Sequence, residues 1–266
     1  SPTLRHIALL LRHVVQDRAF PLIVGGWLLL IGPEVYAGLG NSEPLVRVVP
    51  DSRDALNRVW WDVVPIAAAL LLVYSSDRVC RMYAAIRMHE LVAATPFRSW
   101  AHIALQLLVI TLIALALLGL AVLAALTAQF AAQSAIQPAE YLPHVAFLAP
   151  QLVLLATLFV AVHALVRARY LANLTNFLLT MLCYTSAAYS FGLYHPLWRP
   201  AATPLVKADH YWGFDGSLDG HAPYLIFWAF TCFALLVLAM ATYHRNMGFA
   251  QVRWLDVPRR PVVAVV

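Results

Sequence analysis

The sequence has little charge. Only 12% of its 266 residues are Asp, Glu, Lys or Arg, whereas an average soluble domain has roughly a quarter. Hydrophobic residues make up 62%, and the mean hydropathy is +0.74. A soluble domain could not hide so much apolar side chain, and the same composition excludes a disordered chain. We therefore expect a membrane protein, and the modest net charge of +5 predicts no nucleic-acid partner.

Motifs for catalysis and for metal binding are also missing. There is no Gly-x-x-x-x-Gly-Lys-Ser/Thr loop, so this chain does not bind ATP through a P-loop. His89 and Glu90 begin like a zinc-peptidase helix, but Ala93 stands where the second His is needed. The three cysteines have no metal-ligand spacing and predict no disulfide framework: Cys80, Cys183 and Cys232. We expect no catalytic residue, metal or cofactor in this chain.

Six apolar runs are candidates to cross the hydrocarbon core, which takes about 20 helical residues. They cover residues 20–39, 60–74, 100–132, 145–166, 174–194 and 224–243. The second run is short, and the third is longer than a crossing needs. The expected fold is an all-α polytopic membrane protein with six transmembrane helices. Its transmembrane domain covers residues 20–245, and a C-terminal tail covers 246–266.

The basic residues are unevenly divided between the two sides of these spans. Thirteen arginines fall on the side of the N-terminus, and five basic residues fall on the other side. Loops in the cytoplasm carry an excess of Lys and Arg. We therefore expect both termini in the cytoplasm, so the segments that flank the spans on that side are called inner.

The spans contain almost no ionisable groups. His163 falls near the inner end of the fourth run, and Glu34 and Asp62 fall near the outer ends of the first two. Ion-coupled carriers usually place carboxylates or histidines near the middle of the membrane. Their scarcity argues against ion coupling, so a transporter of this kind would take its energy from a partner that hydrolyses a nucleotide.

The first 19 residues predict an amphipathic helix in the inner membrane interface. Apolar side chains recur at three- and four-residue spacing over residues 3–18, and arginines stand off that stripe. The stripe consists of Leu4, Ile7, Leu11, Val14 and Val15. An anchor that sets the angle of the first span is an equally good interpretation.

The inner segment 77–96 predicts a short separate helix between the second and third spans. Asp77 suits the start of a helix, where a negative charge interacts well with the helix dipole, and Pro96 ends it near Thr95. Such a helix could transmit force from a soluble partner to the membrane, although a simple surface connector has the same pattern. The candidate docking residues are Asp77, Arg78, Arg81, Arg87, Glu90, Thr95 and Pro96.

The outer segment 196–223 is rich in aromatic and turn residues. These side chains could line an exit path or hold a lipid-like substrate, but interfacial anchoring is the commoner role of such residues. Three histidines at this face are weak evidence for a metal, and we expect none. The candidate contacts are Tyr211, Trp212, Phe214, Asp215 and His221.

The order of these elements resembles the permease subunit of an ABC-2-type exporter. The resemblance rests on the interfacial helix, the six spans and the helix that leads through a Leu-x-x-Ala-Thr-Pro type turn into the long third span. Its residues run from Asp77-Arg78 through Leu91-Val92-Ala93-Ala94-Thr95-Pro96 to Arg98-Ser99-Trp100. The family usually has more Glu and Arg at the start of this helix than the present chain has.

The chain also resembles the membrane half of ABC-2-type proteins that are fused to an M1-type aminopeptidase. The similar segments are Arg169-Tyr170-Leu171-Ala172-Asn173 and the loop from Asp209 to His221. The family implies that two permease halves, identical or paralogous, pair around a path in a bacterial inner membrane. It also implies ATP-binding subunits that hold ATP and Mg²⁺ and receive the 77–96 helix in a groove, so this chain would not itself be an enzyme.

Two other classes remain open from the sequence. A membrane scaffold or anchor subunit of a larger complex would need no substrate path. A membrane-embedded enzyme or an ion-coupled carrier would need buried polar groups, which are scarce here. Lipid, peptide, antibiotic and polysaccharide substrates all fit an apolar and weakly charged path.

Overall fold

The computed structural model describes residues 2–40, 59–60, 63–85, 99–133, 136, 138–166, 168–185, 187–203, 217–244 and 249–250. The described chain is helical apart from one pair of two-residue strands, β1 (Tyr243–His244) and β2 (Phe249–Ala250), which lie antiparallel. The helices are α1 (Pro2–Val15), α2 (Ala19–Gly40), α4 (Val64–Ala85), α6 (Ser99–Ala131), α7 (Pro138–Leu165), α8 (Arg169–Tyr184), α9 (Ala187–Ser190), the 3-10 helix η1 (Pro196–Trp198) and α10 (Ser217–Thr242).

Four of these helices are long and apolar enough to cross a bilayer. The crossing segments are Ala19–Tyr36, Trp100–Ala131, Tyr141–Leu165 and Gly220–Thr242. They correspond to the first, third, fourth and sixth apolar runs of the sequence. The chain is therefore a multi-pass membrane protein, and the predicted all-α class is confirmed.

The second and fifth runs differ from the prediction in extent. Helix α4 begins at Val64 and continues without a break past Asp77 to Ala85. The predicted separate helix starting at Asp77 is therefore wrong, because the first part of segment 77–96 is the last part of α4. The helix passes through Ser75 and Ser76, and their hydroxyls donate to the carbonyls of Leu71 and Val73 of the same helix.

The fifth run is not one helix over 174–194. Helix α8 ends at Tyr184, and Thr185 takes an extended backbone while its hydroxyl donates to the carbonyl oxygen of Met181 at 2.6 Å. The Thr185 backbone N–H donates to the same oxygen at 3.0 Å, so the helical hydrogen bonding of α8 ends at this residue. The apolar run continues beyond this point, but the helix does not.

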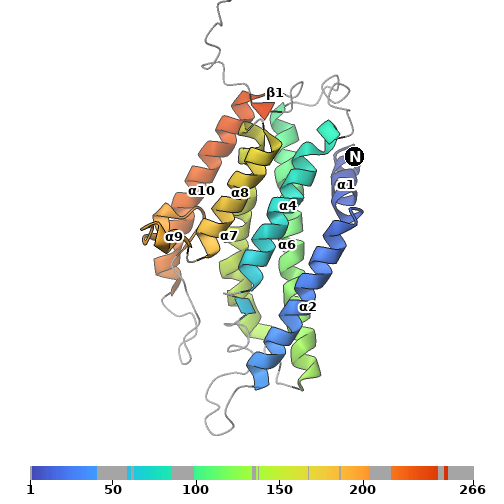
Figure 1. The fold of residues 1–266 in the computed structure, drawn as a ribbon, viewed down its shortest axis with the longest axis vertical. Coiled ribbons are helices and arrows are strands. Elements are labelled where there is room, and N and C mark those ends of the chain that lie inside the picture. Colours follow the sequence, from blue (N-terminus) through green and yellow to red (C-terminus); the bar gives the residue numbers. More distant parts are fainter. Residues whose placement is uncertain are drawn as a thin grey trace, which may run out of the picture.

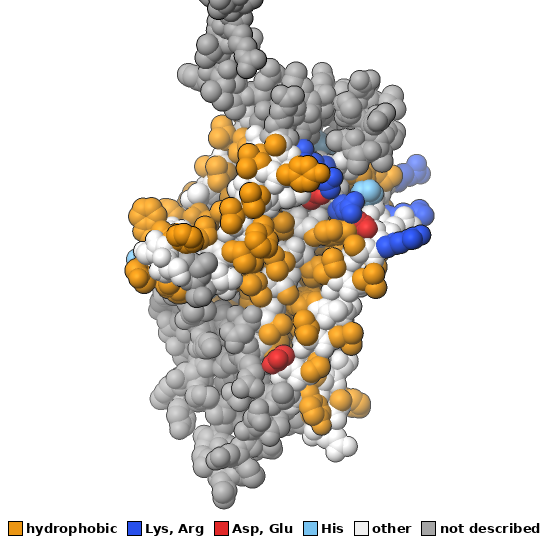
Figure 2. Space-filling view, in the orientation of Figure 1, with side chains coloured by type: hydrophobic (Ala, Val, Ile, Leu, Met, Phe, Trp, Pro, Cys, Tyr) orange, Lys and Arg blue, Asp and Glu red, His pale blue; other side chains and the backbone are white. Residues whose placement is uncertain are grey.

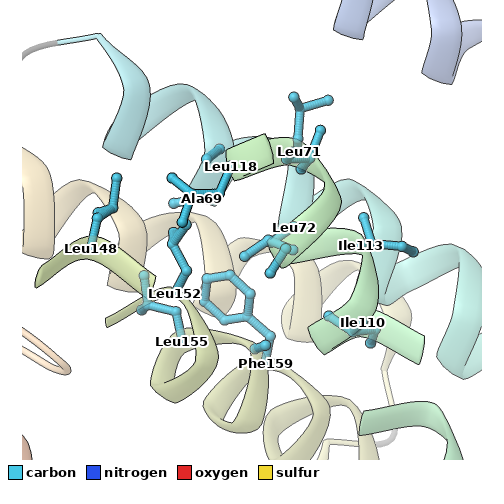
Figure 3. Packing of buried hydrophobic residues seen from close by; sticks show 14 of the residues in the cluster. Ala69, Leu71, Leu72, Ile110, Ile113, Leu118, Leu148, Leu152, Leu155 and Phe159 are labelled. Carbon is cyan, nitrogen blue, oxygen red and sulfur yellow. The ribbon is translucent and has the colours of Figure 1, made fainter. Parts of the chain in front are cut away.

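The long helices run side by side, and α7 is at the centre of their packing. It contacts α10, α6, α4 and α8, and α2 packs on the far side of α6. Figure 1 also shows that α8 and α10 end well before the lower ends of α6 and α7. In Figure 3, Phe159 of α7 points toward Leu72 of α4 among leucines and isoleucines of α4, α6 and α7. The centre of the core is thus an apolar contact between these three helices, and buried residues of α1, α2 and α10 extend it.

Among the described residues, charged side chains are concentrated at one end of the bundle. On the face drawn in Figure 2, most blue and red side chains gather toward the upper end, and orange side chains cover much of the surface below. This end is where α1 and α8 begin and α4 ends. We call it the charged end. An apolar band beside a charged rim is the surface expected of a protein embedded in lipid.

Helix α1 packs against this end through part of the predicted stripe, since Ile7, Leu11 and Val14 lie on the core. Leu10 and Val14 are fully buried, whereas Leu4 and Val15 are exposed. The helix contacts α4 and α6 and rises steeply beside them in Figure 1. Some apolar residues of α1 therefore face the bundle and others face away from it. An apolar stripe in the sequence does not show which residues face which side.

A matched pair of substitutions tests the core. Phe159 is 0% exposed between helices, and Phe230 of α10 is 72% exposed. Phe159→Ala leaves a cavity and should lower the free energy of unfolding by about 3 kcal/mol, whereas Phe230→Ala should cost less than about 1 kcal/mol. Thermal unfolding of the purified protein in a nonionic detergent measures both. Equal effects would contradict the packing described here.

Candidate functional site

Near the charged end, α4 takes part in a cluster of polar side chains that joins it to three other parts of the chain. We call it the charged node and define it as Asp17, Tyr74, Asp77, Arg78, Arg81 and Arg169. Three of its members, Asp77, Arg78 and Arg81, are among the predicted docking residues. They lie within two turns of α4. Residues one apart on a helix fall on different faces, and residues four apart fall on one face at different levels, so the three side chains reach different neighbours.

Asp77 pairs with Arg169, the first residue of α8. Arg169 donates from Nη2 to Oδ2 at 2.6 Å and from Nε to Oδ1 at 3.0 Å. This two-pronged geometry is the strongest that arginine makes with a carboxylate. It also places a negative charge at the start of α8, where the helix dipole favours one and where the N-cap residue Ala168 offers no side-chain acceptor. The pair therefore fixes α8 to α4.

Asp17 ties the corner between α1 and α2 to the same part of α4. Its Oδ2 accepts from the Tyr74 hydroxyl at 2.6 Å and lies 2.7 Å from Arg78 Nη2. The Arg78 guanidinium also sits over the Tyr74 ring, 5.3 Å from its centre. The Tyr74 hydrogen bond is the main cause that holds the pKa of Asp17 below its ordinary value, so the folded protein favours the charged carboxylate.

Two further contacts complete the connections of α4. Arg81 Nη2 donates to the carbonyl oxygen of Val166, just after the end of α7, at 3.2 Å. Gln106 of α6 donates to the carbonyl oxygen of Cys80 at 3.4 Å, and its amide nitrogen lies 3.0 Å from His102 Nε2. The inner part of α4 is thus joined by polar contacts to the α1–α2 corner, to α6, to the end of α7 and to the start of α8.

The other predicted site residues are not brought together. Arg87, Glu90, Thr95 and Pro96 of the docking segment lie outside the described residues, as do Tyr211, Trp212, Phe214 and Asp215 of the outer segment. His221 is a residue of α10 and is buried, with its ring edge-on to Phe147 at 4.7 Å. His221 therefore does not lie in a loop, because α10 begins at Ser217, inside the predicted loop, and its role as a contact stays a prediction. Within the described ranges, no three His, Cys, Asp or Glu side chains could hold a metal ion.

Sequence reasoning missed Asp17 and Tyr74 as members of the node and noted Arg169 only as part of a resemblance. One signal in the sequence could have pointed to Asp17, and the same signal applies to Asp77. Asp17 is the only acid in the first 33 residues, and Asp77 is the only acid between Asp62 and Glu90. Both stand among arginines at the ends of apolar runs, where an acid is best explained by an ion pair.

The unequal burial of the Asp77–Arg169 pair gives an asymmetric prediction. The Asp77 side chain is 9% exposed and that of Arg169 is 50% exposed. Arg169→Gln leaves a buried carboxylate without its partner and should destabilise the fold by about 2–3 kcal/mol. Asp77→Asn leaves a cation that already reaches solvent and should cost about 1 kcal/mol or less. Chemical unfolding of both variants in detergent measures the difference, and a larger loss for Asp77→Asn would contradict it.

The depressed pKa of Asp17 predicts an acid-sensitive corner. Its interactions stabilise the fold fully above the ordinary carboxyl pKa of 3.8 and are lost as the pH falls below that value through the folded-state pKa. The unfolding temperature of the wild type should therefore fall more steeply in this range than that of Asp17→Asn. Tyr74→Phe keeps the ring beneath Arg78 and should also weaken the acid dependence. Identical pH profiles for all three proteins would exclude the role of this corner.

Comparison of the chain with protein-family models, with curated proteins and with solved structures finds no match. The functional interpretation therefore depends on the molecule's own features. These are the four apolar helices that can cross a bilayer, the gathering of charge at one end, and the polar contacts of the charged node.

Proposed function

We propose that this chain is the transmembrane permease subunit of an ATP-binding-cassette exporter in a bacterial inner membrane. It would form half of the translocation path, and a second copy or a related chain would supply the other half. ATP and Mg²⁺ would be bound and hydrolysed on a separate subunit docked at the charged end. Both termini would then lie in the cytoplasm.

The proposal includes six spans, with α4 and α8 added to the four apolar helices. Helix α4 has 22 residues and packs against α6, α7 and α8. Helix α8 has 16 residues, or about 24 Å at 1.5 Å per residue, which is short of the ~30 Å hydrocarbon core. The segment that follows it, through α9 and η1, would complete the fifth crossing.

The observation that supports the proposal best is the way the charged node joins α4 to its neighbours. The segment 86–98 connects the end of α4 directly to the start of α6. A partner that pushes on this segment would displace α4, and the ion pairs at Asp17 and Arg169 would pass the displacement to the α1–α2 corner and to α8. Directed charge pairs resist separation more than apolar contacts do, since their energy depends on distance and orientation.

The distribution of charge also favours an external energy source. The four apolar spans contain no Asp, Lys or Arg, and their only acid, Glu34, is exposed near one end. Their four histidines all stand within the first or last four residues of a span, away from its middle: His102, His144, His163 and His221. A carrier driven by an ion gradient needs ionisable groups along its path. Hydrolysis of ATP on a partner needs only a mechanical connection, which the charged node would provide.

Charge reversal in the docking segment tests the proposal. Arg81 is a poor choice because it bonds to Val166 and its loss would disturb the fold. Arg87→Glu, in the docking segment, should reduce the amount of ATPase subunit that co-purifies with the chain about tenfold, because an interface charge is replaced by its opposite. Arg12→Glu, on the exposed face of α1, is the matched control and should leave assembly intact.

The measurements are the ratio of the two subunits after gentle purification and the ATPase activity of the complex. An ATPase subunit that binds Arg87→Glu as well as the wild type would refute docking through this segment. Purification of a stable complex that contains no ATPase subunit would favour the scaffold interpretation instead.

A further inference from the structure

Arg199 is a buried arginine beside the middle of α7, where the nearby Thr203 accepts a hydrogen bond from Gln151. It follows η1, in the segment that connects α8 to α10, and only 7% of it is exposed. Arginine side chains near a membrane surface normally extend their charged heads to water or to lipid phosphates. Arg199 instead keeps its charge inside the protein, so its burial needs a reason.

The contacts of Arg199 do not neutralise its charge. Its Nη1 donates to the Tyr189 hydroxyl at 3.3 Å, and its guanidinium lies over the Tyr189 ring, 5.1 Å from the centre. Its Nε is buried without a hydrogen-bond acceptor in the described ranges. No carboxylate of the described residues forms an ion pair with it. A buried cation with only a neutral phenol as its partner is incomplete, and an oxyanion is the group that would complete it.

The segment that carries Arg199 is held in place by its neighbours. The carbonyl oxygen of Pro200 accepts from the Cys183 thiol of α8, and Thr203 accepts from Gln151 of α7 at 2.7 Å. Ala201, between these two anchors, has a φ of 55°, a conformation that a residue with a side chain rarely adopts. The backbone that follows Arg199 is therefore fixed to α8 and to α7.

Four exposed aromatic side chains stand within the ten residues that precede Arg199. We call them the aromatic collar and define it as Tyr189, Phe191, Tyr194 and Trp198, of which Trp198 is 69% exposed. Figure 2 shows orange side chains gathered at the left edge, where Figure 1 draws α9. The collar therefore offers an apolar surface beside the buried charge of Arg199, on which the apolar chain of an amphiphile would lie.

We propose that Arg199 and the aromatic collar form a binding site for an anionic amphiphile. The oxyanion head group would pair with the Arg199 guanidinium, and the apolar chain would lie against the collar. Tyr189 belongs to both parts, since it holds the guanidinium and lies at the edge of the apolar surface. This site does not depend on the exporter proposal, because a scaffold or a carrier could bind the same ligand.

The test uses the purified full chain in a nonionic detergent and dioctanoyl phosphatidylglycerol as the anionic probe. The unfolding temperature of the wild type should rise with probe concentration and reach a plateau. Arg199→Gln should raise the half-saturating concentration about tenfold, which is the loss expected for one charge-assisted hydrogen bond. Arg12→Gln removes an exposed arginine of α1 at the charged end and should behave as the wild type.

Two more probes separate the possible sources of the effect. Dioctanoyl phosphatidylcholine has the same chains without net charge and should bind more weakly than the anionic probe. Inorganic phosphate should give no comparable shift, and a full shift with phosphate alone would overturn the assignment to an amphiphile. An Arg199→Gln variant that responds like the wild type would overturn the proposal, since an acidic side chain of the chain itself would then be the better partner.

A second variant keeps the test decisive where Arg199→Gln does not fold. Trp198→Ala changes an exposed side chain of the collar and should leave the fold intact. It should weaken binding of the anionic probe several-fold by removing apolar contact area. A half-saturating concentration equal to that of the wild type would refute the role of the collar.

Discussion

Charged side chains on α4 need partners because the helix passes directly from an apolar stretch into charge. Asp77, Arg78 and Arg81 follow the buried residues of its first half within a few turns. An isolated charge beside hydrocarbon is strongly unfavourable, so each of these groups has a partner on a neighbouring element. Those partners lie on the α1–α2 corner, on α8 and after α7. The requirement to satisfy charge therefore also sets how the ends of the helices are connected.

The class of the fold could be predicted from the sequence, and the details of two helices could not. Four apolar runs became crossing helices because length and hydropathy decide that outcome without reference to neighbours. The sequence does not predict the continuation of α4 through Asp77, because hydropathy falls at this residue and such a fall usually marks the end of an apolar helix. The end of α8 at Tyr184 was missed for the opposite reason, since the apolar run continues after the backbone has turned at Thr185.

The members of the charged node were only partly predictable. Asp77, Arg78 and Arg81 stand out by their local pattern, but the partner of Asp77 lies 92 residues away at Arg169. Asp17 and Tyr74 are 57 residues apart. No local periodicity records such pairings, which arise when α1 and α8 are packed against α4. The same limit applies to His221, whose burial against Phe147 follows from the contact between α7 and α10.

The arginines of the bundle have two kinds of partner. At the charged end, the partly exposed Arg78 and Arg169 pair with carboxylates of the chain itself, so these charges connect its helices. Arg199, beside the middle of α7, is more deeply buried and is held by a tyrosine, so its positive charge is not neutralised by a carboxylate of the described residues. The faces of α6 and α7 are lined by small buried residues such as Ala121, Ala125 and Ala156. Smooth faces of this kind let helices approach closely and shift without breaking directed bonds. In the proposed exporter, a displacement that starts at the charged node would therefore pass along α4 and its neighbours to the segment that carries Arg199 and its proposed anion site.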